Sequence, residues 1–330
     1  MTDLTAVVMF IGVIAYALFG GADYGAGFWD LTAGGAVRGR RTRALIDSSL
    51  SPVWEANHTW LIFCLVMIWT GFPPAFAAIT TTLYIPLGLT ALGIVVRGAG
   101  FAFRKVLLRT AHQRVTGAAF ALSSVCTPFF MGTVAGAIAS GRVPTGGHGD
   151  ALASWVNPTS LLGGILAVAA CAYLAAVFLA GAARQRRAGA LERGFRRRAL
   201  GAGAAAGAVA LAGVFVLRSD APRLFHQLRT DGLPLLIASA VFGVAALALL
   251  FGHRSHVVVR TLAAAAIATV VAGWGVAQYP CLLGTHLTIQ QAAAPAPTLW
   301  VLFAVSCVAA LLIAPSLLLL YALQLRRRLG

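Results

Sequence analysis

The chain alternates long apolar runs with short polar segments. Nine runs are long enough to cross a bilayer core of roughly 30 Å, which takes about 20 residues of helix. They cover approximately Leu4–Phe28, Val53–Gly71, Ala78–Ala102, Thr116–Ala139, Ser160–Ala182, Leu200–Leu217, Gly232–Phe251, Arg260–Ala277 and Leu299–Leu323. The pattern therefore predicts an all-α polytopic membrane protein with about nine transmembrane helices, in which residues 1–330 form a single integral membrane domain.

Charged side chains are scarce and lie between the runs. Only 10% of the 330 residues are charged, whereas a soluble domain has about 25%. The net charge of +16 comes from arginines that follow the first, third, fifth and seventh runs and end the chain. Basic segments stay on the cytoplasmic side, so we expect the N-terminus outside and the C-terminus cytoplasmic. This explanation of the basic charge is preferred to nucleic-acid binding, and we expect no nucleic-acid partner.

Two of the nine acidic residues, Asp23 and Glu55, belong to apolar runs. We expect Asp30 and Asp47 at the membrane interface, and the other five acids in solvated segments. Because successive runs cross in opposite directions, Asp23, Glu55 and Arg97 should lie at a similar depth near the cytoplasmic side. Ionisable groups at membrane depth are costly and are usually paired or functional. We expect Arg97 to pair with Asp23 or Glu55, and the residues leave open whether the pair is structural or gives protons access.

His58 follows Glu55 by three residues, so both share one face of the helix. The two side chains can exchange protons, although a packing or hydrogen-bonding role is the favoured interpretation of His58. Trp54, Asn57 and Trp60 lie beside this pair and are expected around the polar cluster, with the tryptophans as anchors near the interface.

The first run also contains Gly20, Gly21, Gly25 and Gly27. Small residues let neighbouring helices approach closely. The same glycines weaken a helix, so a kink or an unwound turn near Asp23 is a second expectation.

The sequence gives little reason to expect a cofactor held by this chain alone. The five cysteines form no CxxC or metal-spaced pair and are expected to be unpaired packing residues. Of the seven histidines only His58 lies near an apolar run, so a haem with two histidine ligands is not expected here. No catalytic, cofactor-binding or metal-binding residue is predicted.

Several segments of the first 140 residues or so, together with overall length and topology, resemble subunit II of cytochrome bd-type quinol oxidases. The segments are GADYGAGFWDL (21–31), PVWEANHTWLIF (52–63), FPPAFAA (72–78), TLYIPLGLTALGIVVRGAGFAFR (82–104) and SSVCTPFFMGTVAGAI (123–138). The family's acid of the first helix falls on Asp23, its acid after the tryptophan on Glu55, and its arginine of the third helix on Arg97. Many members have Asp where this chain has Glu55.

The resemblance implies two four-helix bundles plus a peripheral helix, in a bacterial cytoplasmic membrane. It also implies a heterodimer with subunit I, which carries two haems b and one haem d. The complex oxidises quinol and reduces O2 to water without pumping, with protons taken from the cytoplasm. Subunit II supports assembly and is expected to supply a proton pathway. A quinone bound in this subunit and a small accessory subunit are left open.

Two alternatives remain at this point. A multi-span proton-coupled transporter would also use an intramembrane acid and arginine. A purely structural assembly partner would use the same pair to fix helix packing.

Overall fold

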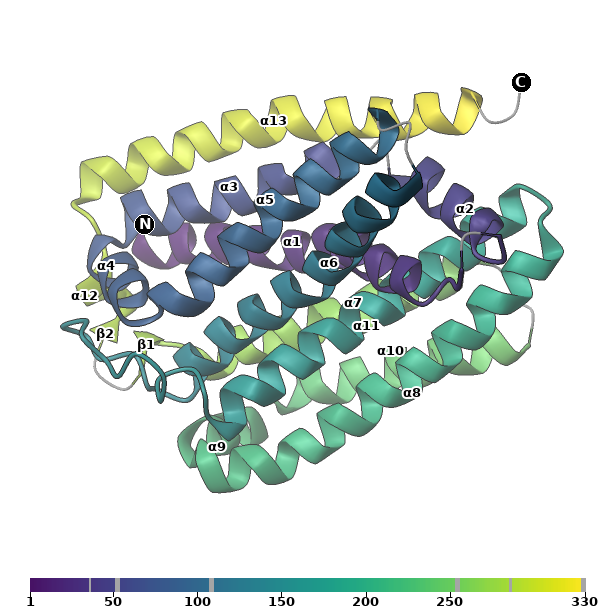
Figure 1. The fold of residues 1–330 in the computed structure, drawn as a ribbon. Helices are drawn as coiled ribbons and strands as arrows, with labels where there is room; N and C mark the ends of the chain where they lie inside the picture. The colour runs from purple at the N-terminus through teal and green to yellow at the C-terminus, as the bar shows by residue number, and fades with distance from the viewer. Residues whose placement is uncertain (36, 51–53, 107–109, 253–255, 285–286, 328–330) are drawn as a thin grey trace.

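The computed structural model describes residues 1–35, 37–50, 54–106, 110–252, 256–284 and 287–327, most of them in long helices that run side by side (Figure 1). The long helices are α1 (Thr2–Leu31), α3 (Trp54–Gly71), α5 (Tyr84–Val106), α6 (Thr110–Ala139), α7 (Pro158–Gln185), α8 (Gly189–Asp220), α10 (Leu233–Phe251), α11 (His256–Gln278) and α13 (Ala296–Arg327). Within the described residues, eight helices are long and apolar enough to cross a membrane. Counting α3 with the short α4 (Pro73–Thr82) as one bent span brings the total to nine. Each predicted apolar run coincides over most of its length with one of the nine long helices, although Val53 of the second run lies outside the described residues and the third run begins within α4.

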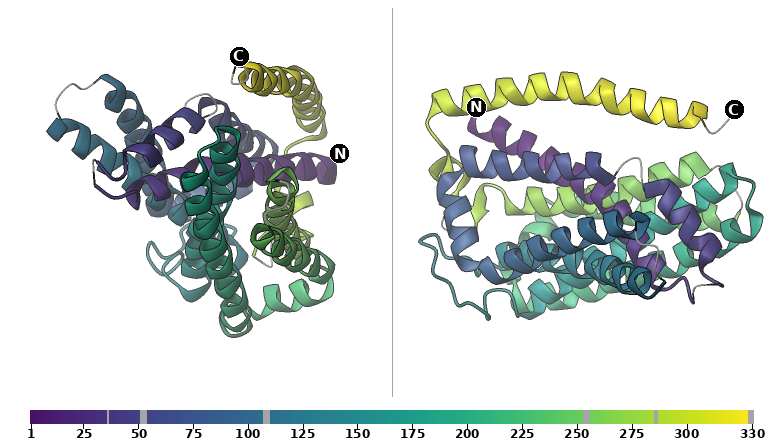
Figure 2. Two further views of the ribbon diagram at one scale, coloured as in Figure 1. Left: turned by 90° about the vertical axis from the view of Figure 1, so that its right-hand side faces the viewer. Right: turned by 45° about the horizontal axis from the view of Figure 1, so that its top comes forward.

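The long helices form two groups of four and one separate helix. Helices α1, α3, α5 and α6 make the first group, and α7, α8, α10 and α11 make the second. Helices α1 and α6 both pack against α7, so these two helices join the two groups. Helix α13 lies apart, along α1 and α3 (Figures 1 and 2). This arrangement agrees with the expected pair of bundles and peripheral helix.

Short elements cap the two ends of the bundle. The end that holds the N-terminus, called the hairpin end here, carries α4, α9 (Pro222–Thr230), α12 (Ile289–Ala292) and the antiparallel strands β1 (Cys281–Leu283) and β2 (Leu287–Thr288). The opposite end, called the arginine-rich end, carries α2 (Arg40–Leu50), the turn between α7 and α8, and the C-terminus (Figure 1). The termini therefore lie at opposite ends, as an odd number of crossings requires.

The hydrophobic pattern did not predict these short elements. Helix α2 was expected as part of a loop, yet Leu45 and Ile46, which follow its arginines, bury their side chains in the core. The third run was expected to begin near Ala78, but residues 78–82 belong to α4, and α5 begins at Tyr84. Pro86 then lies in the first turn of α5, where its missing N–H costs no helical hydrogen bond.

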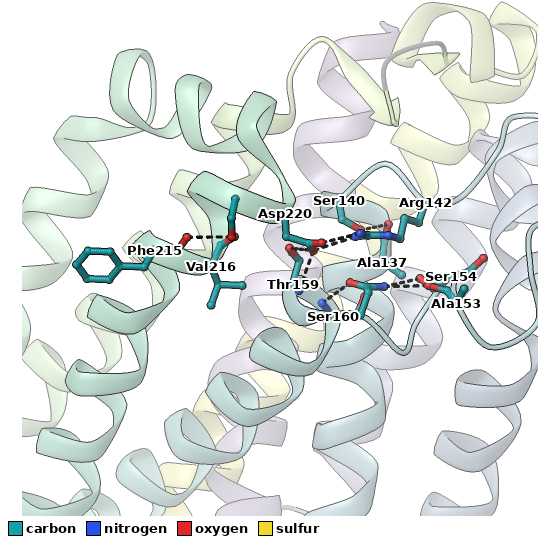
Figure 3. Close-up of polar contacts among 12 residues, drawn as sticks. Ala137, Ser140, Arg142, Ala153, Ser154, Thr159, Ser160, Phe215, Val216 and Asp220 are labelled. Atoms are coloured by element: carbon teal, nitrogen blue, oxygen red, sulfur yellow. Dashed lines mark hydrogen bonds and ion pairs between the residues drawn. The ribbon is translucent and has the colours of Figure 1, made fainter.

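A polar cluster at the hairpin end connects α8 to α7 and to the segment before α7 (Figure 3). Two nitrogens of Arg142 lie 2.9 and 2.6 Å from the carboxylate oxygens of Asp220. The backbone N–H of Thr159 donates to Asp220 Oδ2 at 3.1 Å, and Asn157 caps α7 by accepting from the N–H of Ser160. Asp220 is thus a paired residue with a 14% exposed side chain, and the expectation of a solvated acid is wrong for it.

Helix α1 runs without a break from Thr2 to Leu31. The expected unwound turn near Asp23 is therefore wrong, and the close approach of helices is confirmed. A Cβ atom at Gly25 would overlap the backbone carbonyl of Cys171 on α7. A Cβ atom at Gly27 would overlap the Ser124 hydroxyl on α6. Because these glycines lack side chains, the backbone of α1 lies directly against the backbone of α7 and against the Ser124 side chain of α6.

Candidate functional site

Asp23 and Arg97 form a buried ion pair between α1 and α5. Arg97 Nη2 lies 2.7 Å from Asp23 Oδ1, and the same nitrogen donates to the backbone carbonyl of Asp23 at 3.2 Å. The side chains are 3% and 1% exposed. The structure thus brings together two of the three charged residues that the sequence placed at similar depth.

The rest of the guanidinium is held by α6 and by aromatic rings. Arg97 Nη1 donates to the Ser124 hydroxyl, which itself donates to the carbonyl of Phe120 at 2.6 Å. The Arg97 Cζ atom lies 4.8 Å from the ring centre of Tyr24 and 4.7 Å from that of Phe120. Rings at this distance attract a cation, and the attraction strengthens where water is excluded. Three helices therefore fix one orientation of the guanidinium.

Part of the pair's hydrogen-bonding capacity is unused. Both carboxylate oxygens of Asp23 and Arg97 Nε are buried and make no hydrogen bond within the described part of the chain, and Oδ1 has only its 2.7 Å ion-pair contact with Arg97 Nη2. A buried polar atom without a hydrogen-bond partner costs free energy, and in native proteins such a group calls for an explanation.

Tyr16 and Tyr24 extend the site along α1. Their hydroxyl oxygens lie 3.1 Å apart, and both side chains are buried beside Cys171. The sequence analysis missed these tyrosines, Ser124 and Phe120. Tyrosine and serine are ordinary residues of apolar runs, and only the eight-residue spacing of Tyr16 and Tyr24 around Asp23 would have suggested a shared helix face.

Helix α3 carries the other residues predicted for the site, and fewer of their contacts are described. Glu55 and Trp54 belong to the first turn of α3, and their side chains lie outside the described part of the structure. Asn57 is buried, and His58 is half-buried and has an interaction partner. Trp60 stacks on Phe19, with ring centres 6.3 Å apart, and packs against the Tyr16 and Tyr24 cluster. The roles predicted for Glu55 and His58 stay predictions.

A second ion pair lies at the arginine-rich end of the same helix. Arg43 Nε, on α2, lies 3.0 Å from Asp30 Oδ1, in the last turn of α1. The Asp30 side chain is only 3% exposed. Asp30 therefore lies at the end of α1, with its side chain covered by Arg43 of α2, and its expected place at the membrane interface stays a prediction.

No group of three or more His, Cys, Asp or Glu side chains that could hold a metal ion occurs among the described residues. The candidate site is centred on the buried Asp23–Arg97 ion pair, with Tyr24, Phe120 and Ser124 around the guanidinium.

Comparison with known proteins gives one family. The model of the family described as "Cytochrome bd terminal oxidase subunit II" matches residues 1–324. This match favours the oxidase interpretation over the proton-coupled transporter, and with the apolar helices it indicates a multi-pass membrane protein.

Two curated relatives have names that agree with the family. "Cytochrome bd ubiquinol oxidase subunit 2" of Bacillus subtilis is 23% identical over 172 residues, which are 51% of this chain and 50% of the relative. "Cytochrome bd-I ubiquinol oxidase subunit 2" of Escherichia coli K12 is 27% identical over 173 residues, 48% of this chain and 44% of the relative. The chain thus spans about half the length of the curated relatives it matches.

A solved structure shares the fold. A chain in "The structure of bd oxidase from Geobacillus thermodenitrificans" matches with a TM-score of 0.79 and 24% identity, over 98% of both chains. At this identity the likeness shows the fold alone.

Proposed function

Since the chain belongs to the cytochrome bd terminal oxidase subunit II family, we propose that it works as subunit II of a cytochrome bd-type quinol:dioxygen oxidoreductase. It assembles with a haem-bearing subunit I, and the complex oxidises quinol and reduces O2 to water. Two haems b and one haem d belong to the partner, where they supply electron transfer and oxygen binding.

Within that complex the chain supplies a route for protons. The observation that supports this role most is the buried Asp23–Arg97 pair, which holds an acid beside an arginine between α1 and α5. A proton-carrying site needs an oxygen that can bind and release a proton while the helix packing stays fixed.

Asp23, Arg97 and the residues around the guanidinium have separate roles in the proposed route. Arg97 stabilises the Asp23 carboxylate through Oδ1, and Ser124, Tyr24 and Phe120 hold the guanidinium in place. The Asp23 carboxyl group is the proposed proton-binding group of this pair. Glu55 and His58, predicted on α3, are the further members of this route.

The proposed location is the bacterial cytoplasmic membrane, with the arginine-rich end facing the cytoplasm. This orientation follows from the positive-inside rule applied to the arginines of α2 and of the turn between α7 and α8. In this orientation Asp23 and Arg97 lie closer to the cytoplasmic side, the source of the protons, than to the opposite side of the membrane.

Purification of the tagged chain from its native membrane tests the assignment. The proposal predicts a coloured complex with a second membrane subunit, whose visible spectrum contains the bands of haem b and haem d. A colourless homo-oligomer would contradict it.

A further inference from the structure

The turn between α7 and α8 and the first turns of α8 carry a dense group of arginines that the proposed proton route does not use. Residues 184–198 include seven arginines and one acid, Glu192. Five of the seven have exposed side chains: Arg184, Arg186, Arg187, Arg193 and Arg197. The segment lies at the arginine-rich end of the bundle, so it concentrates positive charge on the surface there (Figure 1).

The acid of this segment is engaged by residues of other helices. Glu192 Oε1 lies 3.0 Å from His256 Nε2 on α11 and 3.9 Å from Arg184 Nη1 on α7. Arg193 and Arg197, one turn apart on α8, form no ion pair or hydrogen bond with any residue that the structure describes. Their guanidinium groups are therefore available to an anion from outside the chain.

The length of α8 places these two arginines at the level of lipid headgroups. Residues 199–217 have no charged side chain and span roughly 28 Å of helix. This length is close to the bilayer core of roughly 30 Å. Arg193 and Arg197 precede this stretch by less than two turns, and a long arginine side chain keeps its charged end in the polar layer.

The face of α8 that carries Arg193 and Arg197 continues as an apolar face. Ala208 follows Arg197 by eleven residues, which is about three turns, and Leu211 and Phe215 follow at spacings of three and four. The side chains of Leu211 and Phe215 are 70% and 75% exposed. One face of α8 thus has guanidinium groups at one end and apolar side chains over the rest, which is the polarity of a phospholipid.

We propose that Arg193 and Arg197 bind the phosphate of an anionic phospholipid whose acyl chains lie along this face of α8. A guanidinium binds phosphate through two parallel N–H donors, and basic clusters beside a membrane helix attract anionic headgroups. Phosphatidylcholine has no net charge, so the site should prefer phosphatidylglycerol. Such binding requires neither the proton route nor oxygen reduction.

The test is the double variant Arg193→Gln with Arg197→Gln in the protein as purified from its membrane. Dioleoyl phosphatidylglycerol or dioleoyl phosphatidylcholine is titrated into dodecyl maltoside micelles, and bound lipids are counted by native mass spectrometry. Each basic residue near a membrane surface strengthens anionic-lipid binding about fivefold. We therefore expect the double variant to bind phosphatidylglycerol about twentyfold more weakly, with unchanged binding of phosphatidylcholine.

Arg218→Gln with Arg229→Gln is the matched control. Both arginines are exposed and lie at the hairpin end, on α8 and α9, where Asp220 and Asp231 reduce the local positive charge. This variant loses the same net charge and should bind phosphatidylglycerol like the wild type. Equal weakening in the two double variants, or a wild type without preference for phosphatidylglycerol, would contradict a lipid site at the first turns of α8.

Co-purification distinguishes a lipid from a protein as the occupant of this face. If the Arg193 and Arg197 double variant loses a subunit that the wild type retains, the face is a protein contact and the lipid proposal is wrong. If the double variant does not accumulate, Arg197→Gln alone repeats the test, with binding about fivefold weaker expected. Wild-type affinity in that single variant overturns the proposal.

Discussion

The Asp23 carboxylate and the Arg97 guanidinium depend on each other. Both are almost fully buried, with side chains 1% and 3% exposed. Moving an ion out of water costs several kcal/mol even after relaxation, roughly 20 kcal/mol in the idealised limit, and only a close partner of opposite charge offsets this. Neither residue can therefore change alone without leaving the other as an uncompensated charge.

Arg97→Leu should lower the yield of assembled complex. The substitution leaves Asp23 buried without its partner, and breaking a buried pair in this way costs about 3–5 kcal/mol. The measurement is the amount of haem-containing complex per milligram of membrane protein. A yield equal to wild type would show that Asp23 and Arg97 do not stabilise each other.

Glu55→Gln should slow oxygen reduction in a complex that keeps its haem. The amide has the size of the acid but cannot act as an acid or base. A proton-carrying role for Glu55 therefore predicts a rate reduced at least about tenfold. Oxygen consumption per haem is the measurement. Loss of haem would instead assign Glu55 to structure.

Much of the site could be predicted from single residues. Asp23 and Arg97 stand out because charge is rare in apolar runs, and an acid and a base at equal depth are expected to pair. Ser124, Phe120 and Tyr24 could not be found in this way, because their contact with Arg97 depends on how α5 and α6 pack. The ion pair of Asp30 with Arg43 could not be predicted either, because it depends on how α2 folds back toward the end of α1.

At the scale of elements, α1 is held by close contacts of its glycines. Gly25 meets the backbone of α7 at Cys171, and Gly27 meets Ser124 of α6. Without a hydrophobic effect between membrane helices, such packing is a main source of association. These contacts set the distance at which Asp23 meets Arg97.

Gly25→Ala should disrupt the bundle. The added methyl group would overlap the Cys171 carbonyl, so α1 and α7 would have to separate, at a cost of about 1–3 kcal/mol or more. Gly21→Ala is the control on the same helix, because its Cβ atom would lie 3.5 Å from Cys171 Sγ, an ordinary contact. Thermal stability of the purified complex distinguishes them, and equal midpoints would contradict this packing.

Hydrophobic periodicity predicted the long helices and not the short ones. A span needs about 20 apolar residues, and this length signal is strong. Helices α2 and α9 and the β1–β2 hairpin have 11 residues or fewer and mix polar with apolar positions, so the sequence left them as loops. Their structure depends on contacts with the ends of the long helices. A hydrophobic pattern read over a short stretch of sequence does not contain information on those contacts.

At the scale of the whole molecule, α1 occupies a central place. It packs against both groups of four helices and carries Tyr16, Asp23 and Asp30 on one buried face. These side chains therefore lie inside the chain, where other helices shield them from lipid.

The double variant Asp23→Asn with Arg97→Gln tests the proton role most directly. It removes the carboxyl group and its counter-charge together, so no buried charge is left unpaired and assembly should survive. The measurement is oxygen reduction per haem in the purified complex. The account predicts normal haem content with a rate at least about tenfold below wild type. Normal haem content with a wild-type rate would contradict it.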